Sequence, residues 1–295
     1  MTMRPVMIVV LLLLLSSRAA TAQEPRSAQG FYQAGDYAAC ARLYAGQADR
    51  TPPVRGAGYD AACCLALAGD REGALARLER TPSDLLREHI AEDPDLVSLH
   101  DDPRWQALLD RYRTDRARTT AGAHLDKALL EELQRRIDRD QEVRERAMRT
   151  PGDEALDAEV GAVDKDNITW LAQYLEAHGW PGYDTVGRSG SLAFFVLAQH
   201  ADQDRSLQAQ VLDMLGQAVE QGQASPIHLA YLTDRLRLAQ DLPQVYGTQF
   251  RLEDGKLSPA PIEDPEHVDE RRGALGMTTL AEYQAMQEDS MAARR

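Results

Sequence analysis

The chain has 295 residues, of which 43% are hydrophobic and 27% are charged, and its formal net charge is −14. These proportions are typical of a folded protein with one large or two ordinary domains, and they exclude a disordered chain. Because a strongly negative chain is repelled by phosphate backbones and anionic lipid surfaces, we expect neither nucleic acid nor a membrane as a partner.

Residues 1–22 have the three-part pattern of a secretory signal peptide. Met1–Pro5 carries one positive charge, Val6–Leu15 is continuously apolar, and Ala20–Ala22 provides small residues for cleavage. The apolar run is ten residues long, whereas a membrane span requires about 20 residues. We therefore expect cleavage near Ala22 rather than an uncleaved anchor, and a mature protein that is periplasmic or secreted.

The chain contains three cysteines, Cys40, Cys63 and Cys64. An odd number cannot pair completely. Since neighbouring residues point to different sides of a helix, only one of Cys63 and Cys64 could form a disulfide with Cys40. The alternative that we favour is that all three are small buried packing residues. There is no CxxC motif and no spacing typical of metal ligands, so we expect no metal and no cofactor.

Two glycine-containing turns, Gly35–Tyr37 and Gly69–Arg71, lie 34 residues apart. Glycine tolerates the left-handed conformation that ends one helix, and the aspartate after it can cap the next. Small residues, Cys40 and Ala74, follow each glycine by five positions, and large apolar ones, Tyr44 and Leu78, follow four positions later. Over about 28–80 the chain resembles the tetratricopeptide family, which has this period.

This resemblance implies antiparallel helical hairpins in residues 23–113. Stacks of such repeats normally need at least three units, and we expect residues 83–113 to supply the missing layer. There, Asp102-Pro103 begins a last helix with Trp105, Leu108 and Leu109 on its buried side. The repeat domain either binds a protein or peptide partner or serves as a spacer for the rest of the chain.

Residues 114–123 are polar and predict a linker, and residues 124–295 predict a second helical domain. Periodic apolar residues predict helices over 124–149, 164–178, 192–200, 206–221, 225–240, 264–272 and 280–286. We expect a turn at 187–191 and a small β-hairpin over 245–262 around Asp254-Gly255. The predicted fold is therefore mainly α, with tetratricopeptide-like hairpins plus a second helical domain that has one β-hairpin.

Polar clusters follow or interrupt several of these apolar helices. An unpaired buried charge is expensive, so an Asp on an apolar helical face, such as Asp234, needs a partner. We expect His200 and Asp234 to meet beside Tyr246, with Arg235 and Arg144 as other possible partners of Asp234. The remaining candidates for ligand binding are Asp140, Gln141, Gln199, Asp202, Gln249, Arg271 and Arg272.

The same residues carry a second resemblance. The chain has Asp140-Gln141 with Arg144, Gly179-Trp180-Pro181, Gln199 to Asp202, Asp234-Arg235, Tyr246 to Gln249, and Arg271-Arg272. With this set, residues 124–287 resemble an uncharacterised bacterial family, one of the domains of unknown function. The resemblance implies a shared fold and brings no activity with it.

Three hypotheses follow for this domain. It binds a small polar ligand in a pocket around His200 and Asp234, which we favour. Alternatively, it is a hydrolase-type enzyme in which His200 acts as acid or base and Asp234 orients it. In the third hypothesis the polar residues form a buried network that only fixes the fold.

Overall fold

A computed structural model describes residues 25–86, 90–119, 124–253 and 256–293. The predicted signal peptide and the Asp254-Gly255 turn lie outside these residues. The described chain is mainly α-helical with one two-stranded antiparallel sheet, which confirms the predicted fold class. No helix in the described part is long and apolar enough to cross a membrane.

The N-terminal part consists of two helical hairpins. The first pairs α1 (Ala28–Gln33) with α2 (Tyr37–Ala48), and the second pairs α3 (Ala57–Leu67) with α4 (Arg71–Arg80). Gly35 and Gly69 have φ of 77° and 85°, as each turn requires. Asp36 and Asp70 then cap α2 and α4 by accepting hydrogen bonds from backbone amides. The hairpins lie where the repeat period places them.

Short 3₁₀ helices and one long helix complete this part. They are η1 (Ser83–Leu85), η2 (Ile90–Glu92), η3 (Pro94–Leu99) and α5 (Pro103–Thr119). Trp105, Leu108 and Leu109 of α5 are buried against α3, α4 and η3 in one apolar cluster. The prediction of a linker over 114–123 is wrong for 114–119, because these residues form the last part of α5. The rest of the predicted linker lies outside the described residues.

A disulfide joins the two hairpins. Cys40 of α2 is bonded to Cys64 of α3, whereas Cys63 is buried and is not part of a disulfide. The favoured interpretation of three unlinked packing residues was therefore wrong for two of them. Adjacent helical residues point about 100° apart, so Cys64 faces α2 and Cys63 faces elsewhere.

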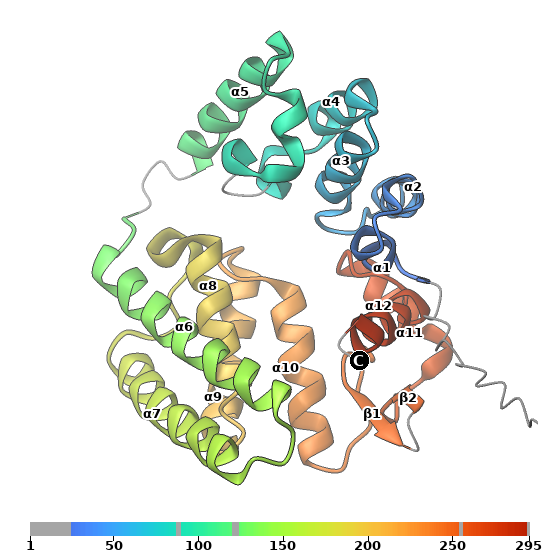
Figure 1. Cartoon of the computed structure of the whole chain (residues 1–295). Coiled ribbons are helices and arrows are strands. Elements are labelled where there is room, and N and C mark those ends of the chain that lie inside the picture. The colour runs from blue at the N-terminus through green and yellow to red at the C-terminus, as the bar shows by residue number, and fades with distance from the viewer. Residues whose placement is uncertain (1–24, 87–89, 120–123, 254–255, 294–295) are drawn as a thin grey trace, which may run out of the picture.

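The second part begins with five helices that pack around one apolar core (Figure 1). They are α6 (Lys127–Arg149), α7 (Glu154–His178), α8 (Tyr183–Gln199), α9 (Arg205–Glu220) and α10 (Pro226–Ala239). Phe194 of α8 is completely buried between aromatic rings of α7 and Trp180. The apolar helix expected at 192–200 is therefore central to the core.

Two helices begin earlier than predicted. α7 starts at Glu154, capped by Asp153, and α8 starts at Tyr183. The expected turn at 187–191 is instead a kink inside α8, where Gly187 adopts φ 65° and ψ −176°. Glycine permits this break, and the helix resumes directly after it.

The chain ends in a small mixed unit. Strands β1 (Phe250–Glu253) and β2 (Lys256–Pro259) form the antiparallel hairpin, with Arg251 paired to Ser258. After it come η4 (Pro265–His267), α11 (Val268–Ala274) and α12 (Leu280–Ala293). α12 is longer than predicted.

The last helix packs back on the first part of the chain, so α12 lies beside α1 (Figure 1). The carboxylate of Asp289 accepts hydrogen bonds from the backbone amides of Arg26 and Ser27 and from the Ser27 hydroxyl. Glu282 receives a bidentate contact from Arg50, at 2.6 and 2.8 Å. The two predicted domains therefore share a polar contact between the ends of the chain.

The contact at Glu282 makes the packing of α12 on the first part of the chain sensitive to acid. Burial alone would raise the pKa of Glu282, but hydrogen bonds from Arg50, Thr279 and Gln47 lower it from 4.5 to about 2. Because the pKa is lower in the folded state, this stabilisation is complete above pH 4.5 and is lost as the pH falls towards 2.

We predict that Glu282→Gln reduces the loss of stability between pH 5 and pH 2, because the substituted side chain has no proton to take up. The measurement is urea unfolding at a series of pH values. Glu270→Gln, which changes an exposed carboxylate of α11, is the control and should leave the acid dependence of the wild type. Equal acid dependence in Glu282→Gln and the wild type would contradict the prediction.

Candidate functional site

His200 lies at the C-terminal end of α8, directly against α6. Its Nδ1 is 3.0 Å from both carboxylate oxygens of Asp140. Asp140 is completely buried, whereas 19% of the His200 side chain is exposed. An ionised carboxylate can only accept, so Nδ1 carries a proton and donates it to Asp140, which leaves Nε2 as the ring nitrogen outside this contact. Among the described residues, Nε2 has no hydrogen-bond partner.

Two further side chains complete the environment of Asp140. Gln141 donates to it through Nε2 at 2.7 Å, and Arg144 donates through Nε at 3.1 Å. The other end of the Arg144 guanidinium is hydrogen bonded to Asp164 of α7. Arg144 therefore bridges two carboxylates, and His200 contacts one of them.

The two carboxylates differ in proton affinity. Burial opposes ionisation of both, but the hydrogen bond from His200 and the charge of Arg144 lower the pKa of Asp140. At Asp164 burial outweighs the effect of Arg144, and its pKa is raised. Pairs of acids whose pKa values move apart in this way are common where proton transfer is catalysed.

A second ion pair lies two residues further along the chain. Asp202 accepts from both Nε and Nη2 of Arg235 on α10. Burial would raise the pKa of Asp202, but its bonds with Arg235 lower it. Gln208 of α9 donates to Asp202 and to the carbonyls of Ala198 and Gln199 at the end of α8. The end of α8 is thus fixed to α9 and α10.

Asp234 has a different role from the one that the sequence suggested. Its fully buried carboxylate accepts from the backbone amides of Val245, Tyr246 and Thr248 at 2.7–3.2 Å and from the Thr248 hydroxyl at 2.9 Å. The expected pairing of His200 with Asp234 was wrong. Asp234 is saturated by the turn at 245–248, and Asp140 is the carboxylate that contacts His200.

The carbonyls of the same turn are bound by two arginines of α11. Arg271 donates to Val245 O at 2.9 Å, and Arg272 donates to Tyr246 O at 2.7 Å. Arg272 is 1% exposed and also donates to Thr278 O, while its guanidinium lies 5.1 Å from the centre of the Tyr283 ring. Both arginines are therefore engaged with the backbone.

The remaining candidates join these groups or lie beside them. Gln249 accepts from Arg235 at 3.4 Å and donates to Thr248 at 3.1 Å, which connects Asp202 to Asp234 through a continuous set of hydrogen bonds. Tyr246 contributes its backbone to the turn. Gln199 is half-buried, and its backbone carbonyl accepts a hydrogen bond from the side chain of Gln208. The candidates therefore form two adjacent clusters at the end of α8.

Several residues in these clusters were not predicted. Asp164 looked like part of an acidic helix start, and Gln208 looked like a residue of a plain packing helix. Gln244 is completely buried and binds Gln249 and Ala260. A polar residue at a position of an apolar helical stripe is the signal that could have identified Asp164. No comparable signal exists for Gln244, which lies in an irregular segment.

Residues 126–294 match the family described as "Family of unknown function (DUF6624)". The chain belongs to this family. The match covers the elements from α6 to α12 and therefore both polar clusters. No curated protein matches the chain. No solved structure matches it either.

We predict that Asp234→Asn destabilises the protein by about 3 kcal/mol, because the amide group turns a donor toward backbone N–H groups that lose their acceptor. Urea unfolding measures this change. Asp241→Asn is the control, since Asp241 is exposed just after α10 and asparagine tolerates its positive φ. A loss below about 0.5 kcal/mol in Asp234→Asn would contradict the structural role assigned to this carboxylate.

Proposed function

We propose that the protein is an exported binding protein. In this proposal the hairpins at 25–119 contact a protein or peptide partner, and the family domain binds a small polar ligand at the end of α8. Export rests on the predicted signal peptide. It is further supported by the Cys40–Cys64 disulfide, because disulfides persist mainly in oxidising compartments.

The observation that carries the proposal is the pair of His200 and Asp140. Asp140 fixes the ring orientation, so Nε2 is available to accept from or donate to a ligand without a change in the fold. The groups that bind Asp140 or follow His200 along the chain carry both signs of charge. Arg144 and Arg235 have 25% and 26% of their side chains exposed, and Asp202 has 40%. A ligand with both donors and acceptors fits these groups best.

The cluster around Asp234 and the turn at 245–248 supports the ligand site but does not contact the ligand. Asp234, Arg271 and Arg272 are used up in binding the backbone of the turn. Their arrangement favours the hypothesis of a structural network for these three residues. The proposed ligand site is therefore limited to the cluster that contains His200.

A second candidate function is acid–base catalysis at the same place. The observation that favours it is the bridge of Arg144 between Asp140 and Asp164, whose pKa values are shifted in opposite directions. In an enzyme of this kind His200 would transfer the proton, and Asp140 would orient it in place of Asp234. Consumption of a bound ligand, as opposed to simple binding, distinguishes this candidate from the first.

We predict that a thermal-shift screen of small polar metabolites and cell-wall fragments identifies compounds that raise the Tm of the chain, and that His200→Gln abolishes this rise. The unliganded Tm should change by only a few degrees, because Arg144 and Gln141 remain bound to Asp140.

His267→Gln is the matched control, since His267 also contacts an aspartate, Asp264, but is exposed on α11's N-terminal side. It should retain the response to ligand. If no compound stabilises the wild type while His200→Gln unfolds at a much lower temperature, the pair is structural and the proposal fails.

A further inference from the structure

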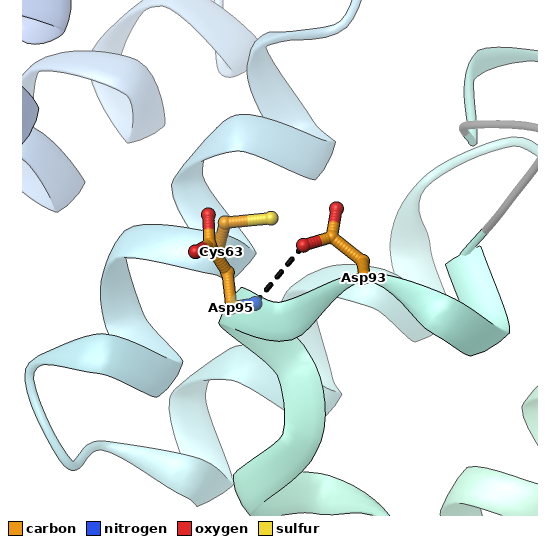
Figure 2. A group of neighbouring side chains, drawn as sticks. All are labelled: Cys63, Asp93 and Asp95. Atoms are coloured by element: carbon orange, nitrogen blue, oxygen red, sulfur yellow. Dashed lines mark hydrogen bonds between the residues drawn. The ribbon is translucent and has the colours of Figure 1, made fainter.

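A thiol and two carboxylates that the proposed ligand site does not use converge in the N-terminal part. Cys63 of α3 and Asp93 and Asp95 at the start of η3 each offer one ligand atom, and these atoms all lie within 4.8 Å of one another. In Figure 2 the sulfur of Cys63 and the carboxylate of Asp93 point toward each other, with Asp95 beside them. The residue Cys63 is 5% exposed.

The disulfide determines which thiol is available here. Cys64 is bonded to Cys40 and ties α3 to α2. Cys63, the next residue on the helix, points about 100° away from it and faces η3. The covalent bond therefore fixes the helix that carries the Cys63 thiol, and it leaves Cys40 no capacity to pair with Cys63.

Neutral donors orient the carboxylates. Tyr59 donates its hydroxyl to Asp93, and the backbone amide of Asp95 donates to the other oxygen of Asp93 at 3.0 Å. The Tyr32 hydroxyl lies 3.0 and 3.1 Å from the two oxygens of Asp95. Metal-binding carboxylates normally have such outer partners, which fix their direction without cancelling their charge.

These groups line a cavity of about 150 Å³. Its lining contains a third carboxylate, Asp60, together with Tyr32, Tyr44 and Gln29. Among the described residues, no Lys or Arg lines it. Three carboxylates beside a thiol favour a positively charged ligand over an anion. An organic ammonium would gain nothing from the thiol, whereas a thiolate is a preferred ligand of zinc.

We propose that Cys63 and one oxygen each of Asp93 and Asp95 bind a divalent metal ion of the zinc class. Binding displaces the proton of the Cys63 thiol to solvent, so the sulfur coordinates as a thiolate. Sulfur as a ligand selects against Mg²⁺ and Ca²⁺, which require oxygen. Three protein ligands leave a fourth position open to the cavity, where water or a donor atom of a partner protein can coordinate.

Spacing along the sequence could not indicate this site, because Cys63 and Asp93 lie on different elements about one repeat apart. The site also differs in place and chemistry from the ligand site at His200. Its failure would leave the proposal for His200 unaffected, and the reverse is also true.

The test uses residues 23–295 with the disulfide intact, after a chelator has removed bound metals. This protein is titrated with Co²⁺ and then with Zn²⁺. We expect a thiolate-to-cobalt charge-transfer absorption that saturates at one equivalent per chain and disappears when Zn²⁺ displaces the cobalt. Cys63→Ser should abolish this absorption. Asp95→Asn should lower the affinity at least about tenfold.

Asp101→Asn is the matched control, because Asp101 is an exposed carboxylate paired with Arg71 outside the cavity, and it should bind Co²⁺ as the wild type does. Absence of the absorption in the folded wild type would overturn the proposal, as would undiminished binding in Cys63→Ser. If Cys63→Ser does not fold, alkylation of the wild-type thiol decides. Protection by stoichiometric Zn²⁺ but not by Mg²⁺ supports the site, and equal alkylation with and without Zn²⁺ overturns it.

Discussion

The turn formed by Val245–Thr248 is held from both sides by opposite charges, and the polar part of the family domain depends on it. Asp234 accepts from its amides, and Arg271 and Arg272 donate to its carbonyls. A buried carboxylate and a buried guanidinium would each be costly alone. Here each charge is stabilised by backbone dipoles of the opposite sign, so an irregular segment acquires one defined conformation.

A series of side-chain contacts connects this turn to the end of α8. Gln249 follows the turn and contacts Arg235, which in turn binds Asp202. Asp202 lies two residues after His200. The ring of His200 is held separately by Asp140, which leaves its other nitrogen outside this contact. Such support for a partly exposed polar group is typical of ligand-binding and catalytic sites, where preorganisation lowers the entropy lost on binding.

Most of the fold could be predicted from the sequence, because helical periodicity, the glycine turns and Asp caps are local signals. The location of the polar groups near the end of α8 was also predictable, but the partners were not. Asp234 lies on an apolar helical stripe, which indicates that it needs a hydrogen-bonding partner. The expected partner was His200, whereas the observed partners are backbone amides. The pairing of His200 with Asp140 spans 60 residues, and no local pattern specifies such a contact. The contact of α12 with α1 was missed for the same reason.

The most direct test of this account is hydrogen exchange of the individual amides of Val245, Tyr246 and Thr248, measured by NMR in the native protein. The account predicts protection close to that of core amides in α10, because these amides are bound to a fully buried carboxylate. In Asp234→Asn their protection should fall much more than that of amides in α3. Exchange at the rate of an open loop in the wild type would contradict the claim that this turn organises the domain.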